Sequence, residues 1–379
     1  MAKIIGICPS IDEPILSGDG YLIRFRPTLG YLNKKQLVSL GKAASQFGNG
    51  VIEFTTRANI SLRGIDKNKL AKLSDFLKRE KIVNQHETKK TVSNVIYSPF
   101  PNLKDKEFLE ISKMIEDQLP YIPKLHKKFG IAVDIGRMAT LQNVHADLRL
   151  EKTTEGSLMI RIDGLEYGEA VERDNIIPLL KKLINNITKC LPCSLKGKNL
   201  AKIIHEIDYK KFHSPIKRPR NQYFLPKLGP CFKGYLLSGS AGRFTGNQLM
   251  QLADQVEKIK ITPWKALFAE KTNRKPKLKF LAKNNDFLLK VSHCSGQPYC
   301  NQALVDTSKL ANGINKRLKY KYKSKVIDAP NIHISGCDKN CGIPKNVSII
   351  ISKFKKNNQA TVIGGAHKKL VHELLLELK

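Results

Sequence analysis

Four of the eight cysteines fall in two close pairs near the end of the chain. Five residues separate Cys294 from Cys300, and three residues separate Cys337 from Cys341. Each pair comes shortly after an apolar run, in a segment that contains glycine and proline, so both pairs are expected on loops that leave strands. Four thiolates are a complete ligand set for a [4Fe-4S] cluster, and this is the chemistry that the pattern favours.

Two other interpretations of these pairs stay open. Zinc also binds four thiolates, although structural zinc sites usually take cysteines two to four residues apart, and the first pair is wider. The four thiols could also be inert and buried. Cys190 and Cys193 form a further pair, but no second pair lies near it in the sequence, so a structural role is expected. Cys8 and Cys231 are single and are expected to be buried as small apolar side chains.

The first hundred residues alternate between strand and helix patterns. After a turn signal at 18–20, the residues at 21–25 alternate as a strand does. Apolar side chains recur at helical spacing over 33–47, and 51–54 has the pattern of a second strand. A second amphipathic helix is expected over 67–82. This order indicates a small α+β module whose sheet is backed by helices.

The same order recurs in the second half of the chain. The expected elements are a strand, a helix and a strand, at 235–237, 247–257 and 258–261. Gly30 corresponds to Gly242 at an offset of 212 residues, and Thr55 corresponds to Thr262 at an offset of 207. An internal duplication predicts two like modules that face each other about a pseudo-twofold axis. A chance recurrence of strand, helix and strand is the alternative.

Other segments are expected to connect these modules. The apolar runs at 287–291 and 332–334, just before the cysteine pairs, are expected strands. The segment 209–220 holds two prolines and five basic residues and is expected to be a linker. The tract 316–325 interleaves tyrosine with lysine, which suits either RNA stacking or, as favoured here, a helix-to-strand connection with a solvated face.

The formal net charge is +33 over 379 residues, which raises the question of an anionic partner. The excess comes mainly from lysine, whereas phosphate and base recognition favour arginine, so no nucleic-acid partner is expected. No run approaches the roughly 18 apolar residues that span a bilayer, and the start lacks the pattern of a signal peptide. A soluble, cytoplasmic protein without a membrane partner is expected.

The cysteine pattern, C-x5-C followed by Gly-C-x3-C, resembles the cluster signature of the siroheme-type nitrite and sulfite reductase superfamily. The segments 55–57 and 62–64 are similar to the first tetrapyrrole-pocket strand of that superfamily. The resemblance implies an α+β fold with duplicated ferredoxin-like half-domains and two nitrite/sulfite-reductase-type α+β domains around a pseudo-twofold axis. The implied half-domains are 1–88 and 223–285. The implied reductase-type domains are 89–208 and 286–379, and the second of these carries the cluster. A basic linker, 209–222, lies between the two halves.

Within the superfamily, the chain resembles the precorrin-3B synthases of aerobic cobalamin synthesis. The segments that carry this likeness, besides the second cysteine pair, are 8–10, 14–24, 98–100, 128–134 and 261–267. This resemblance implies that precorrin-3A lies where siroheme lies in the reductases. It would be oxidised with molecular oxygen, by hydroxylation at C-20 and closure of a γ-lactone from the ring A acetate.

The anion site separates the two activities. The reductases hold sulfite or nitrite over the haem with four basic residues, and the resemblance maps two of them to Arg57 and Lys128. Ser93 and Gly130 stand where the other two are usual, and Ser61 replaces a usual glutamine. Reduction of a small anion needs concentrated positive charge, so half a cage suits the carboxylates of a bulky substrate better.

The resemblance also implies the remaining parts of the site. Asn94 would contact the tetrapyrrole, and Cys341 is the cysteine that bridges cluster and haem in the reductases. A mononuclear non-haem iron would activate oxygen, but no 2-His-1-carboxylate spacing marks its ligands, and the catalytic residues are unknown. His126, His293 and His333 are the histidines near the motifs, and structural or solvent-facing roles are expected for them. An external electron donor, with NADH as a candidate, is also implied.

Three functions follow as hypotheses. The first is a precorrin-3B synthase, the second is a siroheme-dependent nitrite or sulfite reductase, and the third is a basic nucleic-acid-binding protein with a structural metal. Siroheme is a cofactor only under the second. An iron-sulfur absorption shoulder without a Soret-type haem band favours the first hypothesis over the second.

Overall fold

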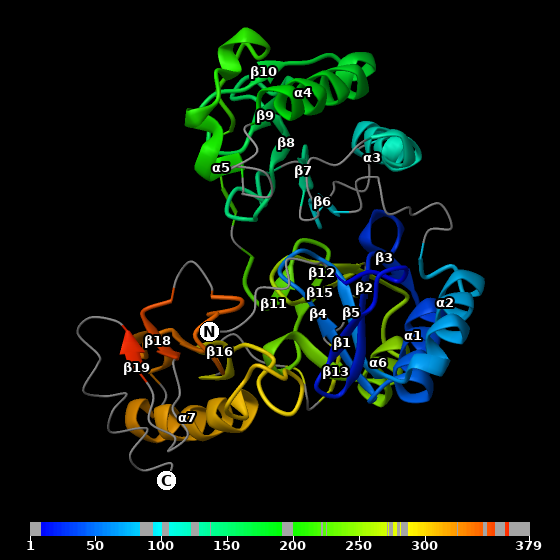
Figure 1. Ribbon diagram of the computed structural model, residues 1–379, viewed down its shortest axis with the longest axis vertical. Coiled ribbons are helices and arrows are strands. Elements are labelled where there is room, and N and C mark those ends of the chain that lie inside the picture. The colour runs from blue at the N-terminus through cyan, green and yellow to red at the C-terminus, as the bar shows by residue number, and fades with distance from the viewer. Residues whose placement is uncertain are drawn as a thin grey trace.

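The chain forms three lobes in the structure, a computed structural model (Figure 1). One lobe combines 9–83 with 226–270, a second holds 94–220, and a third holds 287–363. The residues that the structure describes are 9–83, 94–100, 106–122, 129–136, 138–191, 200–220, 223–224, 226–270, 272, 276–278, 281, 287–323, 325–343, 347–352 and 361–363.

The first sheet is antiparallel and has the strand order β1-β2-β5-β4-β13. In that order the strands are Ile15–Ser17, Gly20–Phe25, Ile60–Ile65, Val51–Phe54 and Arg243–Thr245. Helices α1 (Lys34–Phe47) and α2 (Leu70–Arg79) pack on one face of the sheet, where alternate strand residues enter the core. The other face of the sheet is left for polar side chains.

The second sheet repeats this plan, with the order β11-β12-β15-β14-β3. Its strands are Gly229–Cys231, Gly234–Leu237, Leu267–Glu270, Lys258–Ile261 and Tyr31–Asn33, and its helix α6 is Gly246–Ala253. Each half therefore lends one short strand to the sheet of the other, because β3 pairs with β14 and β13 pairs with β4. The predicted duplication and pseudo-twofold arrangement are confirmed.

The two halves repeat each other down to the helix caps. Asn33 caps α1 in a capping box with Gln36, and Thr245 caps α6 in a capping box with Gln248. Both pairs are related by the offset of 212 residues that relates Gly30 to Gly242. The sequence thus fixes the start of each helix with the same two hydrogen bonds.

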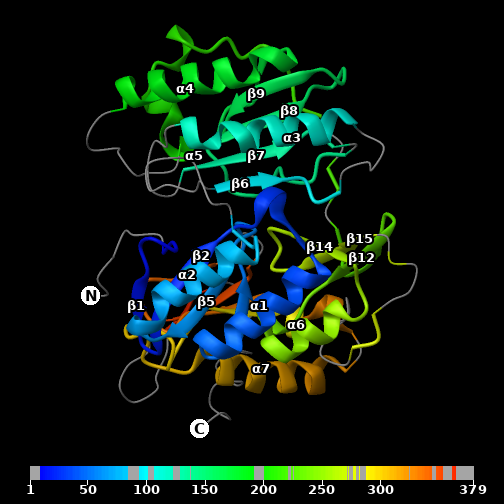
Figure 2. The ribbon, with the colours of Figure 1, turned by 90° about the vertical axis from the view of Figure 1, so that its right-hand side faces the viewer.

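Helices α1 and α6 lie side by side and cross closely (Figure 2). A Cβ atom on Gly41 would lie 2.7 Å from the carbonyl oxygen of Gly246, and one on Gly246 would lie 2.4 Å from that of Gly41. Glycine is required at both positions because backbone meets backbone there. The crossing joins the two halves into one core, in which the Phe54 and Phe244 rings meet edge to face with centroids 5.6 Å apart.

The second lobe has a five-stranded sheet in the order β10-β9-β8-β7-β6. Its strands are Glu169–Ala170, Leu158–Ile162, Leu148–Lys152, Gly130–Asp134 and Asn94–Tyr97. Its helices are α3 (Lys106–Gln118), α4 (Ile176–Cys190) and α5 (Leu200–Ile203). Strands β6, β7 and β8 are parallel, and β7 is buried along its whole length. In β8, Leu148 and Leu150 enter the core, whereas Arg149 on the other face forms a buried ion pair with Asp163.

The third lobe is small and holds the cysteine pairs. Its sheet has the order β16-β17-β18-β19, and the strands are Val291–His293, Ile332–Ile334, Ile349–Ser352 and Thr361–Ile363. Helix α7 (Thr307–Tyr322) packs against this sheet (Figure 1).

Several predicted boundaries change in the structure. The helix expected over 67–82 begins as a 3-10 turn, and its α-helical part is α2. The strand expected over 287–291 is wrong in its first part, because 287–289 is a 3-10 turn and only β16 is extended. The tract 316–325 is mostly the end of α7, which exposes Tyr320. Part of the expected linker pairs with the second lobe, since Lys217 and Gly168 exchange both backbone hydrogen bonds.

None of the helices in the described part of the chain combines the length and apolar composition that a membrane crossing requires.

Candidate functional site

The two cysteine pairs lie on loops that leave neighbouring parallel strands. In the ladder of β16 and β17, His293 is opposite Ile334. Cys294 follows β16 directly, and the Cys337 loop begins after β17. Because parallel strands end at the same edge of a sheet, the two loops meet there. The predicted convergence of the pairs from separate strands thus has a simple topological cause.

Hydrogen bonds join the two loops around the first thiol. The backbone N–H of Gly336 donates to the Sγ of Cys294 at 3.1 Å, and the N–H of Cys294 donates to the carbonyl oxygen of Ile334 at 3.0 Å. The N–H of Leu304 donates to the carbonyl oxygen of Gly336 at 2.9 Å. A thiol that accepts a backbone N–H is prepared to carry negative charge.

All four thiols are free and close enough to influence one another. Burial raises the pKa of Cys337 and of Cys341, and the charges of Cys294 and Cys300 raise both pKa values further. A set of thiolates at this place is therefore costly until a cation neutralises it, which is the situation of an iron-sulfur or zinc ligand set.

The donor set consists of four thiols, which is the number that a [4Fe-4S] cluster takes. Among the described residues, no three His, Cys, Asp or Glu side chains converge closely enough to share one metal ion. The four thiolates of a [4Fe-4S] cluster need not meet at one point, because each binds a different iron atom. For the implied mononuclear iron, the described part of the chain likewise contains no group of two histidines and a carboxylate that could bind it.

The histidines near these loops bond to backbone and hydroxyl groups. The Nδ1 of His293 lies 2.8 Å from the carbonyl oxygen of Cys294. The ring of His333 contacts the Ser292 hydroxyl at 2.9 Å and the Cys341 carbonyl at 3.1 Å. Burial lowers the pKa of each histidine to about 4, so both rings are neutral near pH 7. These contacts agree with the structural roles expected for them, whereas His126 lies outside the described residues.

A charged network links the third lobe to the first sheet through Tyr299. Arg63 donates to the Tyr299 carbonyl oxygen at 2.6 Å, and its guanidinium lies 4.8 Å from the ring centroid. Arg63 also pairs with Asp19 at 3.0 Å, and Arg243 lies 5.8 Å from the same ring. Because Tyr299 directly precedes Cys300, this network positions the first cysteine loop. Sequence motifs marked Arg63 only as part of a pocket strand.

Arg57 lies on the tight turn that follows β4. The N–H of Thr55 donates to the carbonyl oxygen of Asn59 at 3.0 Å, and Ala58 takes a positive φ of 53°. Arg57 is half-buried, and its charge reaches the second lobe at His145, since burial and then Arg57 lower the pKa of His145. The predicted tetrapyrrole contact therefore lies between two lobes.

The other predicted pocket residues lie at the start of two parallel strands. Asn94 opens β6 and is opposite Gly130, the first residue of β7. Gly130 is buried, and its N–H donates to Asp147 at 2.9 Å. Lys128 and Ser93 are outside the described residues, so their predicted roles stay predictions.

The remaining cysteines behave as isolated thiols where they are described. Cys231 is buried in an aromatic cluster with Phe100 and Phe268, and burial raises its pKa to about 11. Cys190 is exposed at the end of α4, while Cys8 and Cys193 lie outside the described residues.

Comparisons with known proteins agree on the fold. Residues 14–79 match the nitrite/sulfite reductase ferredoxin-like half domain. The chain is 24% identical over 373 residues to a precorrin-3B synthase from a Sinorhizobium species, and the match covers 90% of this chain and 79% of the relative. The structure of the Mycobacterium tuberculosis NirA protein matches with a TM-score of 0.63 at 14% identity, over 90% of this chain and 73% of that chain. The nitrite/sulfite reductase-type fold and the resemblance to precorrin-3B synthases are confirmed.

Proposed function

We propose that this chain is a precorrin-3B synthase, an oxidoreductase that oxidises precorrin-3A with molecular oxygen in cobalamin biosynthesis. The observation that carries the proposal is that four free thiols lie near Arg63 and Arg243, whose guanidinium groups contact the Tyr299 ring beside Cys300, which suits a polycarboxylate tetrapyrrole next to an electron carrier. Similarity over 90% of the chain to a precorrin-3B synthase supports the same choice.

Cys294, Cys300, Cys337 and Cys341 would hold a [4Fe-4S] cluster, which supplies single electrons when bound. The backbone of Gly336 would stabilise one thiolate through its N–H. The Arg63–Tyr299 contact would keep the first loop in place while the charge at the thiols changes. An external donor, with NADH as the candidate, would deliver the electrons.

Arg57 would bind a carboxylate of precorrin-3A between the first and second lobes, with Lys128 and Asn94 as further contacts. Position 130 favours the synthase over a siroheme reductase. Gly130 is buried and carries no side chain, so it cannot supply the cation that the reductases use to hold nitrite or sulfite. The finer chemistry, hydroxylation at C-20 with γ-lactone closure, is part of the proposal. A mononuclear iron that activates oxygen is also part of the proposal.

The decisive experiment is incubation of the iron- and sulfide-reconstituted protein with precorrin-3A and a reductant under ¹⁸O₂. We expect a product whose mass has gained labelled oxygen. Conversion of nitrite or sulfite by a protein with a Soret-type absorption band, without any change to precorrin-3A, would instead assign the chain to the reductases.

A further inference from the structure

Lys260 on β14 lies where the second sheet meets the second lobe. Its neighbours Ile259 and Ile261 enter the core that the two halves share, so the Lys260 side chain points to the opposite face of the sheet. Its Nζ donates to the carbonyl oxygen of Ser98, the residue that follows β6, at 2.7 Å. Lys260 is 1% exposed, and Ser98 is fully buried. A lysine of the first lobe is thus held inside its contact with the second.

Three aromatic rings surround the Lys260 amine. Its Nζ lies 4.6 Å from the ring centroid of Tyr31 on β3, 5.3 Å from that of Phe108 on α3 and 6.0 Å from that of Tyr97 on β6. Tyr31 belongs to the first lobe, whereas Phe108 and Tyr97 belong to the second. A cation over an aromatic ring is attracted by the ring electrons, and more strongly where water is excluded. The second lobe therefore supplies most of a cage that fits a lysine side chain.

Hydrogen bonds continue from this contact into the strands of the second lobe. The Ser98 hydroxyl lies 3.0 Å from the Thr140 hydroxyl, which donates to Asp134 at the end of β7 at 3.1 Å. The other ends of β6 and β7 are Asn94 and Gly130, which are paired in the sheet. Because β6 has four residues and β7 has five, a shift at the Ser98 end of these strands also moves the Asn94 end.

The internal repeat gives this contact a counterpart on the first sheet. Positions 260 and 270 of the second sheet correspond to Glu53 and Arg63 of the first, at the offset of 207 residues. Arg63 donates to the carbonyl oxygen of Tyr299 in the third lobe, and Lys260 donates to a carbonyl oxygen in the second. Each sheet thus contacts a further lobe through a buried cation and a backbone carbonyl group. The same contact is built at two junctions from different positions, which indicates that the buried cation serves docking.

The surroundings of Lys260 disfavour its charged form. The charged side chains that face it are two carboxylates, on β15 and α3, and two cations, on β14 and after β2: Glu270, Glu116, Lys258 and Arg26. Burial lowers the pKa of Lys260 to about 7, the two cations act in the same direction, and the two carboxylates oppose them. Tyr31 and Tyr97 stay neutral, because burial raises the pKa of each. The amine can lose its proton without losing its hydrogen bond to Ser98, since a neutral amine still has N–H groups to donate.

We propose that Lys260 is a positioning residue, which docks the second lobe on the second sheet and so fixes the place of Asn94 relative to the Arg57 turn. An exposed lysine keeps its proton up to about pH 10, whereas the docked one releases it near neutral pH. Docking should therefore tighten as the pH rises from about 7 toward 10. The docking goes beyond the proposed function, and only the effect on the substrate rests on it.

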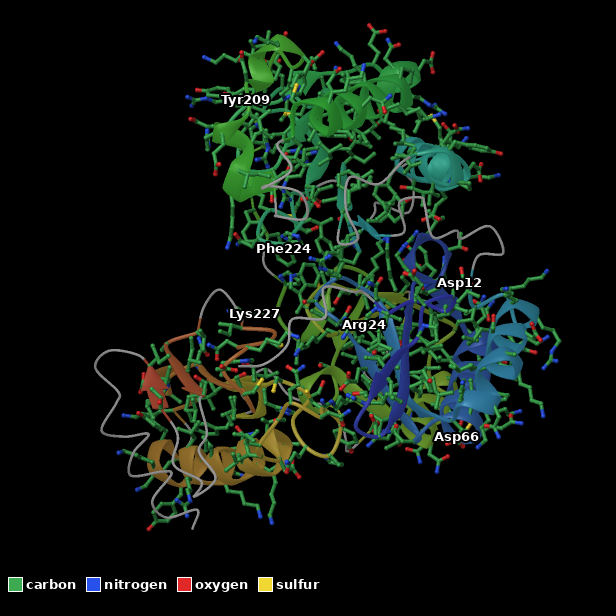
Figure 3. The ribbon with its side chains drawn as sticks, in the orientation of Figure 1. Asp12, Arg24, Asp66, Tyr209, Phe224 and Lys227 are labelled. Atoms are coloured by element: carbon green, nitrogen blue, oxygen red, sulfur yellow. The ribbon has the colours of Figure 1, made fainter. Side chains whose placement is uncertain are left out.

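The single tryptophan of the chain reports on this junction. Trp264 stacks on Phe100, two residues after Ser98, with the ring centroids 5.9 Å apart and the planes at 10°. Phe224 belongs to the same aromatic cluster, where the second lobe meets the first (Figure 3). The wavelength of maximum Trp264 emission in the reconstituted full chain therefore follows the docking of the second lobe, and no substrate is needed.

We expect Lys260→Met to shift this emission to longer wavelength at neutral pH, and Lys260→Arg to recover part of the shift. The wild-type emission should move to shorter wavelength from about pH 7 to about pH 9, and both variants should lose this dependence, because arginine cannot release its proton there. Lys258→Met is the matched control, because Lys258 lies on the same strand and contacts the Tyr31 ring at 3.7 Å but is exposed. It should behave as the wild type. The same emission and pH dependence in wild type and Lys260→Met would overturn the docking.

Hydrogen exchange separates docking from folding. Lys260→Met should accelerate exchange in β6 and α3, and leave β8 and β9, which lie farther from the first lobe, at the wild-type rate (Figure 2). Faster exchange throughout the second lobe would show a loss of folding and would overturn the positioning role.

Steady-state kinetics with precorrin-3A test the effect on the substrate. Lys260→Met should raise KM roughly tenfold with little change in kcat, as expected when one hydrogen bond of a charged group no longer holds the binding residues in place. A raised KM without a shift in emission would contradict an effect through docking. If the wild type does not convert precorrin-3A but the emission results hold, the proposed function is wrong and the docking role of Lys260 stands.

Discussion

Arg63 and Tyr299 are 236 residues apart in the sequence and in direct contact, with the guanidinium bonded to the Tyr299 carbonyl oxygen and placed over the ring. Arg63 is buried in this contact and keeps Asp19 as its ion-pair partner. A residue of the first half-domain thus fixes the residue that precedes a candidate cluster ligand. The sheet and the cysteine loop therefore act as one unit.

Replacing Arg63 with methionine should lower the free energy of unfolding by about 3 kcal/mol, because Asp19 loses its ion-pair partner and keeps only the hydrogen bond from the Asn49 amide. Urea denaturation of the reconstituted protein measures this loss. Arg173→Met is the control, since its pair with Glu110 is about half exposed and should contribute less than about 1 kcal/mol. Equal losses for the two variants would contradict a positioning role for Arg63.

Cys337→Ser should remove the iron-sulfur absorption and reduce bound iron from about four atoms per chain toward zero, because one corner of the cluster loses its ligand. Iron and sulfide analysis after reconstitution checks this. Cys190→Ser is the matched control, because Cys190 is exposed at the end of α4, and it should retain the full cluster. A Cys337→Ser protein with the wild-type iron content would show that the ligand assignment is wrong.

Arg57→Met should weaken the binding of precorrin-3A by roughly ten- to a hundredfold, since a hydrogen bond to a charged group contributes about 1.5 to 3 kcal/mol. Arg57→Lys should recover part of this affinity through its charge. Arg218→Met tests the loss of an arginine elsewhere, because Arg218 is exposed and contacts Tyr167. If all three variants bind alike, Arg57 does not contact the substrate.

Stability should depend on pH through Asp134 in the second lobe. Burial raises the pKa of Asp134 to about 6, although the N–H groups of Leu141 and Thr140 donate to it. Between pH 4 and pH 6 the folded protein keeps a proton that the unfolded chain has lost. The free energy of unfolding therefore falls as pH rises, by about 3 kcal/mol in total.

Asp134→Asn should abolish this part of the pH dependence, because the amide does not titrate and its oxygen still accepts the backbone bonds. Urea unfolding of both proteins at intervals from pH 4 to pH 7 gives the comparison. Parallel curves for wild type and variant would show that Asp134 titrates normally.

The strands that could be predicted are those with a local signal. The expected strands at 51–54, 258–261 and 332–334 coincide with β4, β14 and β17. The exchanged strands β3 and β13 could not be predicted in the same way. Each has three residues with only one buried apolar side chain among them, and each depends on a partner in the other half of the chain.

In the candidate site, too, the residues with a local sequence signal could be predicted and the others could not. The cysteine pairs follow recognisable strands, so their meeting could be predicted from spacing and topology. The pairing of Arg24 with Ser61 on the polar face of the first sheet comes from the register between β2 and β5, which no local sequence pattern shows.

The strand exchange also determines when the molecule can fold as it is synthesised. Glu53 on β4 meets Arg243 on β13 across 190 residues of sequence. Until those later residues leave the ribosome, β4 has an unpaired edge, which is the kind of edge that recruits other chains. The first half-domain cannot complete its sheet before the second half of the chain is synthesised. Its completion waits for the second, so a chain interrupted between the halves would be released with an open sheet.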